Sequence, residues 1–370
     1  MKKIFVINPG STSTKLALFE DKKCTFSTNV FHDSSILMKF PKINDQLMYR
    51  MMVIQLFLEE NHIDLNGLDA IVGRGGSCYS VKSGIYEVTD QLISDTREAK
   101  GGLYHVSMLG VQLAKELSNL YGGRIFMMDP PIVDEYCDAA RITGVKGVYR
   151  KAVSHALNVK ATARFHCEKY ALDYTKSNFI ICHIDGGISI TAHKQGQMID
   201  GNDAGGGQGP FTPTRMGSMA VTDILALLET KTKEELRALC YEAGGLSSHF
   251  GTSNADKIHE LVEQGDSHAC RVWEAMCYQI SKWIGSMATV LDGQVDGILL
   301  TGGLLRFQDI IDSIEKHCSW IAPIYSYPGE FEQEAMAYGA LDVLNGKREL
   351  SEYTGKPVWD GYMDESTLTY

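Results

Sequence analysis

The sequence predicts an α/β protein made of two domains of the same design. The chain has 370 residues, which is long enough for two hydrophobic cores. Each half opens with a pattern of strand, turn and strand, and each half contains an apolar strand that follows an amphipathic helix and ends in two glycines. The two glycine-ended stretches have identical spacing, Asp69-x-Ile71-x-x-x-Gly75-Gly76 and Asp296-x-Ile298-x-x-x-Gly302-Gly303. We interpret this as an internal duplication, with two domains facing each other across a central cleft.

In the first half, the strands expected from apolar runs are residues 3–7, 16–19, 24–31, 68–72 and 124–128. A helix is expected over residues 45–61, where Met52, Val53, Leu56 and Phe57 follow helical spacing. A second helix is expected over residues 107–120. The run Asp129-Pro130-Pro131 then ends any regular element, so we expect the chain to cross between the domains there.

The second half repeats this order. The strands expected are residues 179–184, 189–193 and 198–201, followed by a long helix over residues 273–291. On this helix Met276, Ile280, Ile284 and Met287 share one face. The helix leads into the strand that ends at Gly302-Gly303, which completes the repeat.

The loop at residues 8–15, Asn-Pro-Gly-Ser-Thr-Ser-Thr-Lys, lies between the first two strands. Main-chain N–H groups, Ser and Thr hydroxyls and a Lys are groups that hold a phosphate. The loop does not match the pattern of a P-loop and no helix follows it. From these residues alone, a phosphate-binding hairpin and an ordinary Ser/Thr-rich turn remain equally good interpretations.

Four further glycine loops follow predicted strands or lie beside them, at residues 73–76, 183–187, 205–210 and 301–303. Glycine allows the backbone to approach a ligand closely, and ligands in open α/β sheets bind beyond the strand ends. Five such loops in one chain favour a nucleotide site over a plain sheet.

Composition and charge indicate which partners and which cellular compartment the protein has. Hydrophobic residues make up 44% of the chain and charged residues 22%, as in ordinary globular proteins. The net charge of −11 argues against nucleic acid or an anionic membrane as a partner. No apolar run approaches the length of a membrane span and the N-terminus lacks a signal-peptide pattern, so a cytoplasmic protein is expected. The nine cysteines contain no Cys-x-x-Cys pair, which fits a reducing compartment.

Across residues 3–346 the sequence resembles the acetate and butyrate kinase family, and within that family it is most similar to the butyrate kinases. The stretches that carry the resemblance are residues 6–15, 72–76, 154–158, 209–215 and 300–303. The resemblance implies two ribonuclease H-like α/β domains of the sugar kinase/Hsp70/actin type. It also implies reversible phosphoryl transfer between ATP and butyrate or a similar short-chain carboxylate, with Mg²⁺, to give an acyl phosphate and ADP.

The resemblance also implies roles for individual residues. Arg74 matches the family arginine that holds the substrate carboxylate, and Arg215 matches the arginine that stabilises the transferring phosphoryl group. His155 and His183 match the histidines near that group. Asp129 matches a residue that places metal and substrate. A carboxylate is already a nucleophile, so this chemistry needs alignment and charge neutralisation more than a strong base.

The remaining matches concern ATP and the metal. Asn8 and Glu334 match metal-associated positions, although a solvated acidic helix start explains Glu334 nearly as well. The residues expected to bind the nucleotide are Asn8, Ser11, Thr12, Ser13, Lys15, Gly186, Gly187, Thr301, Gly302 and Gly303.

Two positions depart from the family pattern. Asp185 stands where butyrate kinases usually have a small residue, and Arg306 follows the last glycine loop. An Asp facing a phosphate at about 4 Å would cost roughly 4 kcal/mol at an effective dielectric of 20. We expect Asp185 instead to cap the backbone of its own glycine loop. An acetate or propionate kinase, a catalytically impaired nucleotide-binding homologue and, more remotely, an actin- or Hsp70-like ATPase are the alternatives.

The domains expected are residues 1–130 with 335–370, which include the returning C-terminal helix, and residues 131–334. Residues 355–370 lack periodicity and are expected to form a mobile tail. A homo-oligomer is expected because dimers are common in the family.

Overall fold

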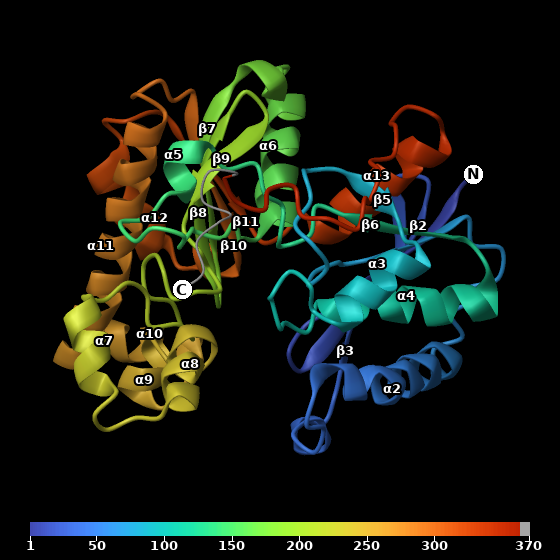
Figure 1. Cartoon of the computed structure of the whole chain (residues 1–370), viewed down its shortest axis with the longest axis horizontal. Helices are drawn as coiled ribbons and strands as arrows, with labels where there is room; N and C mark the ends of the chain where they lie inside the picture. The colour runs from blue at the N-terminus through green and yellow to red at the C-terminus, as the bar shows by residue number, and fades with distance from the viewer. Residues whose placement is uncertain (363–370) are drawn as a thin grey trace. The chain divides into compact units, whose positions relative to one another are not determined.

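The computed structural model describes residues 1–362. The chain divides into two compact units, one formed by Met1–Asp134 with Phe331–Tyr362 and the other by Glu135–Glu330. Figure 1 shows a sheet with flanking helices in each unit. Among the described residues, no helix is both long and apolar enough to span a membrane.

The first unit contains a six-stranded sheet in the order β3-β2-β1-β4-β6-β5. Strands β1, β4 and β6 are parallel, whereas β2, β3 and β5 pair antiparallel with their neighbours. The strands are β1 (Lys3–Pro9), β2 (Ser13–Glu20), β3 (Lys23–Phe31), β4 (Ala70–Gly73), β5 (Ile85–Glu87) and β6 (Arg124–Met128). The predicted hairpin at residues 8–15 is confirmed by the antiparallel register of β1 and β2.

Helices of the first unit cover this sheet (Figure 1). They are α1 (Ser34–Leu37), the 3-10 helix η1 (Ile43–Gln46), α2 (Leu47–Glu60), α3 (Asp90–Arg97), α4 (Met108–Tyr121) and α13 (Glu332–Leu344). Both α4 and α13 pack against β1, β4 and β6. The face expected for α2 is confirmed in part: Val53 and Phe57 pack against the core, but Met52 and Leu56 are about half exposed. The buried positions also include Met51, Ile54 and Arg50.

The second unit contains a five-stranded sheet in the order β11-β10-β7-β8-β9. Strands β7, β10 and β11 are parallel, and β8 and β9 complete an antiparallel meander with β7. The strands are β7 (Asn178–Ile184), β8 (Ile188–Lys194), β9 (Gln197–Gly201), β10 (Gly297–Gly302) and β11 (Ile324–Pro328). The three strands predicted at residues 179–201 are confirmed.

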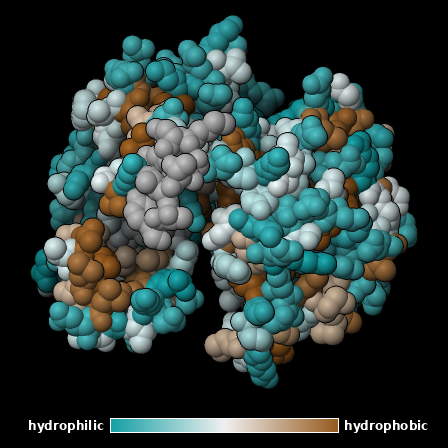
Figure 2. All heavy atoms as spheres, viewed as in Figure 1, coloured by the Kyte–Doolittle hydropathy of each residue, from teal (hydrophilic) through white to brown (hydrophobic). Residues whose placement is uncertain are grey.

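The long predicted helix is α11 (Ser267–Val290), which packs against β7, β8 and β9 and begins six residues earlier than expected. Its predicted face is buried in the core of the unit. Helix α6 (Ala156–Tyr170), which was not predicted, packs against β7 and β10. The other helices are α5 (Asp138–Arg141), η2 (Tyr174–Lys176), α7 (Val221–Leu227), α8 (Lys233–Tyr241), α9 (Leu246–Phe250), α10 (Ala255–Glu263), η3 (Gly303–Arg306) and α12 (Gln308–Cys318). Figure 2 shows hydrophobic surface in the region of α7, where Val221 and Leu225 are exposed.

The internal repeat is visible in the hydrogen bonds of two aspartates. Asp69 accepts a bond from the Lys3 amide at 2.8 Å and returns one from its own amide to the Lys3 carbonyl at 2.9 Å. Asp296 makes the same two bonds with Asn178, at 2.7 Å and 2.9 Å. Each aspartate therefore ties the start of one parallel strand to the start of its neighbour, at equivalent places in the two sheets.

The chain after α13 lies along the first unit. The Ser351 amide donates to the Ile85 carbonyl, and the Val358 amide donates to the Ser80 carbonyl at 3.1 Å. The expectation of a mobile tail from residue 355 is therefore wrong at Val358, because its main chain is hydrogen-bonded. The rest of that expectation, residues 363–370, lies outside the described residues.

Candidate active site

The carboxyl ends of the parallel strands gather the predicted residues of the first unit at one edge of its sheet. Asn8 is the second-last residue of β1, Arg74 follows β4 and Asp129 follows β6. Asn8 and Arg74 are in direct contact, since Arg74 Nη1 donates to Asn8 Oδ1 at 3.2 Å. Strand order therefore explains why residues so far apart in sequence lie together.

A third residue of this cluster is Glu332, the first residue of α13. Its side chain is buried, with Oε2 accepting from Arg74 Nη1 at 2.9 Å and from Asn8 Nδ2 at 2.5 Å. Its other oxygen, Oε1, is buried and has no hydrogen-bond partner among residues 1–362. Glu334, the carboxylate expected from the sequence, is partly exposed, and within residues 1–362 no hydrogen bond or ion pair joins it to Asn8 or Arg74. Residues two apart on a helix point in different directions, so the carboxylate at Asn8 is Glu332 and not Glu334.

Two glycines place Arg74 at the strand end. A Cβ at Gly73 would lie 2.4 Å from the Gly110 carbonyl oxygen, and a Cβ at Gly110 would lie 2.1 Å from the Arg74 carbonyl oxygen. Helix α4 can therefore begin directly against the Arg74 backbone only because both residues lack a side chain. Arg74 Nε is buried without a hydrogen-bond partner in the described chain. The Nε–Nη2 edge of the guanidinium is thus available for a second carboxylate.

Asp129 is fully buried at the end of β6, with a positive φ of 38°. Its Oδ1 accepts from Ser83 Oγ at 2.6 Å and from the Gly84 amide at 2.8 Å. One carboxylate oxygen therefore fixes the segment that leads into β5. Asp tolerates this left-handed conformation better than most residues do.

The hairpin loop between β1 and β2 is held from inside by Arg50 of α2. Arg50 Nη1 donates to the carbonyls of Gly10 (2.9 Å) and Ser13 (3.2 Å), and Nη2 donates to that of Ser11 (2.7 Å). The side chain is fully buried, and burial lowers the pKa of the guanidinium to about 10. Since Arg50 takes up the loop carbonyls, the exposed Ser11 and Thr12 form the outer surface of the turn. The sequence signal that was overlooked is a single Arg inside an apolar helix.

Two more residues complete the hairpin. Thr14 is buried, and its Oγ1 lies 2.8 Å from His32 Nε2. Burial and the nearby charge of Arg50 lower the pKa of His32 to about 4, so this histidine is neutral at pH 7. Lys15 lies directly opposite Asn8 in the β1–β2 register, which places both side chains on one face of the hairpin.

In the second unit the parallel strands β7, β10 and β11 also end at one edge, and the glycine loops lie there. Asp185 follows β7, and its carboxylate accepts from the Gly186 amide at 2.8 Å and from the Gly303 amide at 2.9 Å. The expected cap of its own loop is confirmed, and the same carboxylate also ties the β7 loop to the β10 loop. The hydroxyls of Thr212 and Thr214 both donate to the Gly186 carbonyl, at 2.7 Å and 3.0 Å.

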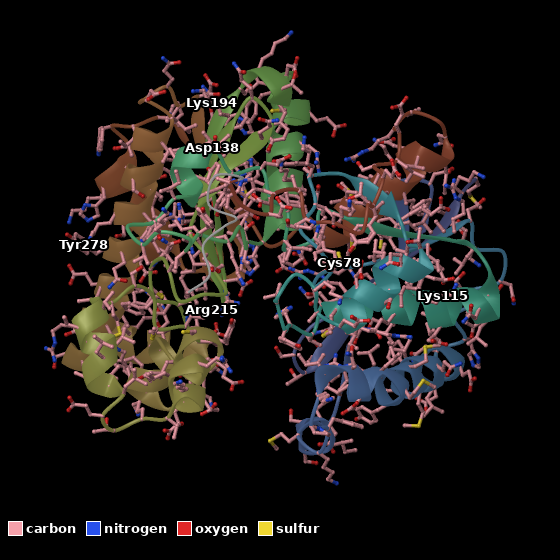
Figure 3. The ribbon with its side chains drawn as sticks, viewed as in Figure 1. Cys78, Lys115, Asp138, Lys194, Arg215 and Tyr278 are labelled. Carbon is pink, nitrogen blue, oxygen red and sulfur yellow. The ribbon has the colours of Figure 1, made fainter. Side chains whose placement is uncertain are left out.

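Arg215 lies against this loop, on the segment between β9 and α7 (Figure 3). Its Nη1 donates to the Ala204 carbonyl, while Nε is buried without a partner among the described residues. Burial lowers the pKa of the guanidinium from its usual value. A Cβ at Gly187 would lie 2.6 Å from Arg215 Nη1, so only glycine leaves room for the guanidinium in this position.

The two predicted histidines stack on each other, with ring centroids 4.0 Å apart and an interplanar angle of 18°. His155 precedes α6, and its main-chain amide and Nδ1 both contact Ser189 Oγ, at 3.1 Å and 2.8 Å. His183 lies on β7 and its Nδ1 contacts Asn158 Nδ2 at 2.8 Å. His183, Asp185 and Glu330 also offer ligand atoms within 4.8 Å of one another.

The last predicted loop follows β10. Thr301 is fully buried, and its hydroxyl donates to the Gly329 carbonyl at 2.9 Å. Gly302 exchanges two main-chain bonds with Gly329, and Gly303 donates to Asp185. Arg306 is paired with Asp256 through both Nε and Nη2, at 2.9 Å and 3.0 Å. The Arg306 side chain, which departs from the family pattern, is therefore fixed by a carboxylate of α10.

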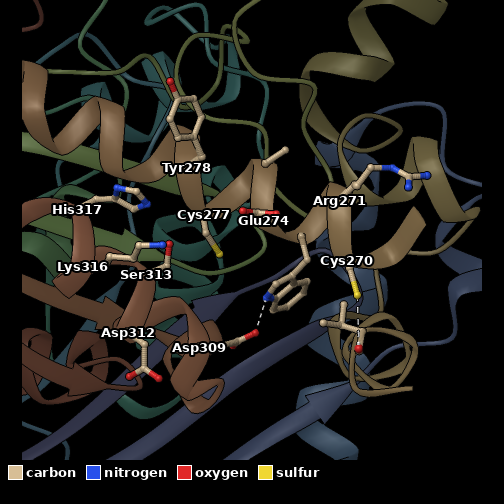
Figure 4. A pocket seen from close by; sticks show the side chains of 13 residues that line it. Cys270, Arg271, Glu274, Cys277, Tyr278, Asp309, Asp312, Ser313, Lys316 and His317 are labelled. Atoms are coloured by element: carbon tan, nitrogen blue, oxygen red, sulfur yellow. Dashed lines mark hydrogen bonds between the residues drawn. The ribbon is translucent and has the colours of Figure 1, made fainter. Parts of the chain in front are cut away.

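A separate cavity of about 770 Å³ lies along α11 and α12 (Figure 4). Its lining mixes cationic, acidic and aromatic side chains, including Arg271, Glu274 and Tyr278, and contains none of the predicted site residues. On its wall Trp273 Nε1 donates to Asp309 Oδ2 at 2.8 Å. The glycine loops, not this cavity, hold the chemistry that the sequence predicts.

Comparison with known proteins identifies the family of the chain. A profile of the Acetokinase family matches residues 147–310. A probable butyrate kinase from Coprothermobacter proteolyticus is 40% identical over 353 residues, which covers 95% of this chain and 99% of the relative. A probable butyrate kinase from Listeria monocytogenes serotype 4a is 41% identical over 352 residues, with the same two coverages. The chain belongs to the acetokinase family.

Solved structures that are similar to this acetokinase family member have the same fold. Acetate kinase from Porphyromonas gingivalis matches 93% of this chain with a TM-score of 0.76 at 19% identity, and all of that chain is covered. A propionate kinase from Francisella tularensis matches 92% of this chain and 99% of its own, with a TM-score of 0.72 at 16% identity. The predicted α/β fold of the sugar kinase/Hsp70/actin type is confirmed.

Proposed function

We propose that this protein transfers the terminal phosphoryl group of ATP reversibly to butyrate or a similar short-chain carboxylate, giving an acyl phosphate and ADP. The observation that carries the proposal is the likeness, at about 40% identity over nearly the whole chain, to relatives named probable butyrate kinases. The acetate and propionate kinases share the fold at below 20% identity, which does not favour their substrates.

Arg74 would hold the substrate acid. A carboxylate takes two parallel hydrogen bonds from a guanidinium edge, and the Nε–Nη2 edge of Arg74 makes no such bonds within residues 1–362. The third guanidinium nitrogen is already oriented by Asn8 and Glu332. An arginine fixed at one nitrogen and available along one edge suits a clamp that must hold the acid in line for attack.

Arg215 and the His155–His183 pair would act on the phosphoryl group. The negative charge on its equatorial oxygens in the transition state is stabilised by cations and N–H donors that are already in place. Arg215 is fixed through Nη1, while its Nε is buried without a partner in the described part of the chain. In the loops at residues 185–187 and 301–303 the amides of Gly186, Gly302 and Gly303 already donate to Asp185 and Gly329, so the glycines would serve by letting the phosphates approach the backbone closely.

Mg²⁺ is implied by the family, and the residues of the first unit fit it. Glu332 Oε1 is a buried carboxylate oxygen without a hydrogen-bond partner among the described residues, and oxygen is the ligand that Mg²⁺ prefers. Glu332 would hold the ion, with Asn8 beside it. When bound, the ion neutralises charge on the phosphates. The arginine on the other Glu332 oxygen keeps that carboxylate oriented.

The proposal also includes the partners, the cellular location and the oligomeric state of the enzyme. The net charge of −11 supports small anionic substrates held at local cations, rather than a nucleic acid or a membrane surface. The unpaired pattern of nine cysteines supports a cytoplasmic location. A homo-oligomer, as is common in the family, is part of the proposal.

The experiment that tests the activity is trapping of the acyl phosphate with hydroxylamine, using purified protein, ATP, Mg²⁺ and straight or branched carboxylates of two to six carbons. The expected result is hydroxamate formation with the highest kcat/KM for a four-carbon acid. A reaction without ATP is the blank, and Arg215→Ala should lower turnover by about 10³-fold, in the range of arginine fingers. Absence of hydroxamate with every acid would overturn the proposal, and a preference for acetate would move the substrate to a two-carbon acid.

A further inference from the structure

Asn158 lies in the first turn of α6 and joins two buried residues of the second unit. Its Nδ2 is 2.8 Å from His183 Nδ1 and 3.2 Å from Thr301 Oγ1. All three side chains are almost fully buried. An amide has a donor end and an acceptor end, so what it offers to a histidine decides which ring nitrogen carries the proton.

The orientation of the amide follows from the hydroxyl of Thr301. That hydroxyl has one hydrogen, which it donates to the Gly329 carbonyl at 2.9 Å. Thr301 Oγ1 can then only accept from Asn158, so the NH₂ end of the amide must face it. With the amide reversed, Thr301 would have to leave Gly329 to reach the amide oxygen. Three hydrogen bonds are at stake: Asn158 to His183, Asn158 to Thr301, and Thr301 to Gly329. The reversed amide can make only two of them at once, whereas the observed amide makes all three.

The same NH₂ group faces His183, so Nδ1 accepts and the proton of the neutral ring resides on Nε2. We propose that Asn158 and Thr301 are positioning residues that hold His183 as its Nε2–H tautomer, so that Nε2 donates a hydrogen bond to an oxygen of the transferring phosphoryl group. The last part of this statement rests on the proposed function. The tautomer itself rests only on the hydrogen bonds of the second unit.

This assignment also bears on the cluster of His183, Asp185 and Glu330. A metal ligand needs a nitrogen lone pair, and the lone pair of His183 is directed at Asn158. Asp185 is also engaged, with each of its carboxylate oxygens accepting a main-chain amide. The geometry therefore makes His183 a donor to an anion and not a ligand of a cation.

The direct test is the tautomeric state of His183, measured on the whole protein by NMR. Protein labelled with ¹⁵N-histidine gives two-bond ¹H–¹⁵N correlations whose pattern separates the two neutral tautomers and the imidazolium. His183 is assigned with His183→Gln. The expected wild-type pattern at pH 8 is the Nε2–H tautomer. A wild-type pattern with the proton on Nδ1, or on both nitrogens, would overturn the inference.

Variants test the cause. Asn158→Asp presents only acceptor oxygens and should move the proton to Nδ1, and Thr301→Val removes the hydroxyl that orients the amide and should give a mixture of tautomers. Thr162→Val is the matched control, because the Thr162 hydroxyl donates to the main-chain carbonyl of Asn158 at 2.8 Å and not to the side-chain amide that faces His183. It should leave the wild-type tautomer. A Thr301→Val protein with the wild-type tautomer and wild-type kcat would contradict the role of Thr301.

Kinetics then separates this inference from the proposed function. Loss of one fixed donor should lower kcat by about 100-fold in Asn158→Asp, with KM for ATP and for the acid changed less than threefold. If the wild type makes no acyl phosphate but Asn158→Asp still moves the proton, the positioning stands and the proposed function fails. If the wild type is active with the proton on Nδ1, the proposed function stands and this inference fails.

Discussion

Glu332 and Arg74, 258 residues apart in the chain, form an ion pair with Oε2 and Nη1 2.9 Å apart, and this pair joins the first residue of α13 to the end of β4. The Glu332 side chain is 3% exposed and that of Arg74 14%, so loss of either partner would leave a charge that is largely buried. The returning C-terminal helix is thus part of the site and not only a cover for the sheet.

Replacing Glu332 with Gln should weaken the binding of Mg²⁺. Gln keeps the size and one carbonyl oxygen but removes the charge, so we expect kcat at saturating Mg²⁺ to fall by about 100-fold or more, in the range of a lost electrostatic contact. The concentration of Mg²⁺ for half-maximal rate should rise. Glu334→Gln is the matched control, and its rate should stay within about threefold of wild type, as for exposed groups. A larger loss in Glu334→Gln than in Glu332→Gln would return the metal role to Glu334.

Gly187→Ala should act through Arg215. The new Cβ would lie 2.6 Å from Arg215 Nη1 and must displace the guanidinium. A displacement of about 1 Å in a catalytic group can cost about 100-fold in rate, so we expect a loss of that size in kcat with a smaller change in KM for ATP. Gly186→Ala adds the same methyl group where no atom lies within 4 Å, and its loss should be at least tenfold smaller. Equal losses would mean that stiffening of the loop, not Arg215, is the cause.

Asp185→Gly should lower stability while leaving nucleotide binding nearly unchanged. The substitution removes the bond that caps the β7 loop and the bond that joins it to the β10 loop. The thermal midpoint should therefore fall, while KM for ATP and the Mg²⁺ requirement stay within a few-fold. Asp185→Asn keeps a hydrogen-bond acceptor without the charge, so its thermal midpoint should lie between those of the wild type and Asp185→Gly. If the Gly variant binds ATP at least tenfold more tightly, Asp185 repels phosphate, since 1.4 kcal/mol gives that factor.

His32 should make the protein less stable as the pH falls below neutrality. The pKa of His32 is about 4 in the folded chain, below the ordinary value of 6.5, so the unfolded chain takes up the proton first. The contribution is therefore complete above about pH 6.5 and is lost as the pH falls towards 4, with a slope of up to about 1.4 kcal/mol per pH unit. Urea unfolding of wild type and His32→Gln between pH 4.5 and 7.5 measures the difference. Parallel curves would show that His32 does not contribute.

Much of the site follows from strand ends, and this is why the sequence was informative. Asn8, Arg74 and Asp129 follow apolar runs, and parallel strands bring such positions to one edge. Glu332 could not be chosen over Glu334 by the same reasoning, because an acidic helix start carries no signal for which carboxylate turns inward. The register of α13 on β1 decides it, and that depends on packing of the whole unit.

Helix α2 shows a second reason why the sequence alone did not reveal the whole site. Its apolar residues are spread around the axis, so helical spacing alone could not show that Met52 and Leu56 are half exposed while Val53 and Phe57 pack against the core. The buried face also contains Arg50, whose charge is stabilised by the carbonyls of a loop 37 to 40 residues earlier. The sequence likewise gave no role to Asn158 within residues 154–158, because its partners on β7 and β10 become neighbours only through the fold.

The paired bonds of Asp69 and Asp296 have a consequence for the history of the chain. At the start of each strand pair the two halves still use the same residue for the same two bonds. At the opposite ends the halves have diverged, to Asn8 and Arg74 in one and to Asp185 and Gly303 in the other. We infer that the two halves descend from one ancestral unit, and that they kept the strand starts, which serve the architecture, while the strand ends came to differ.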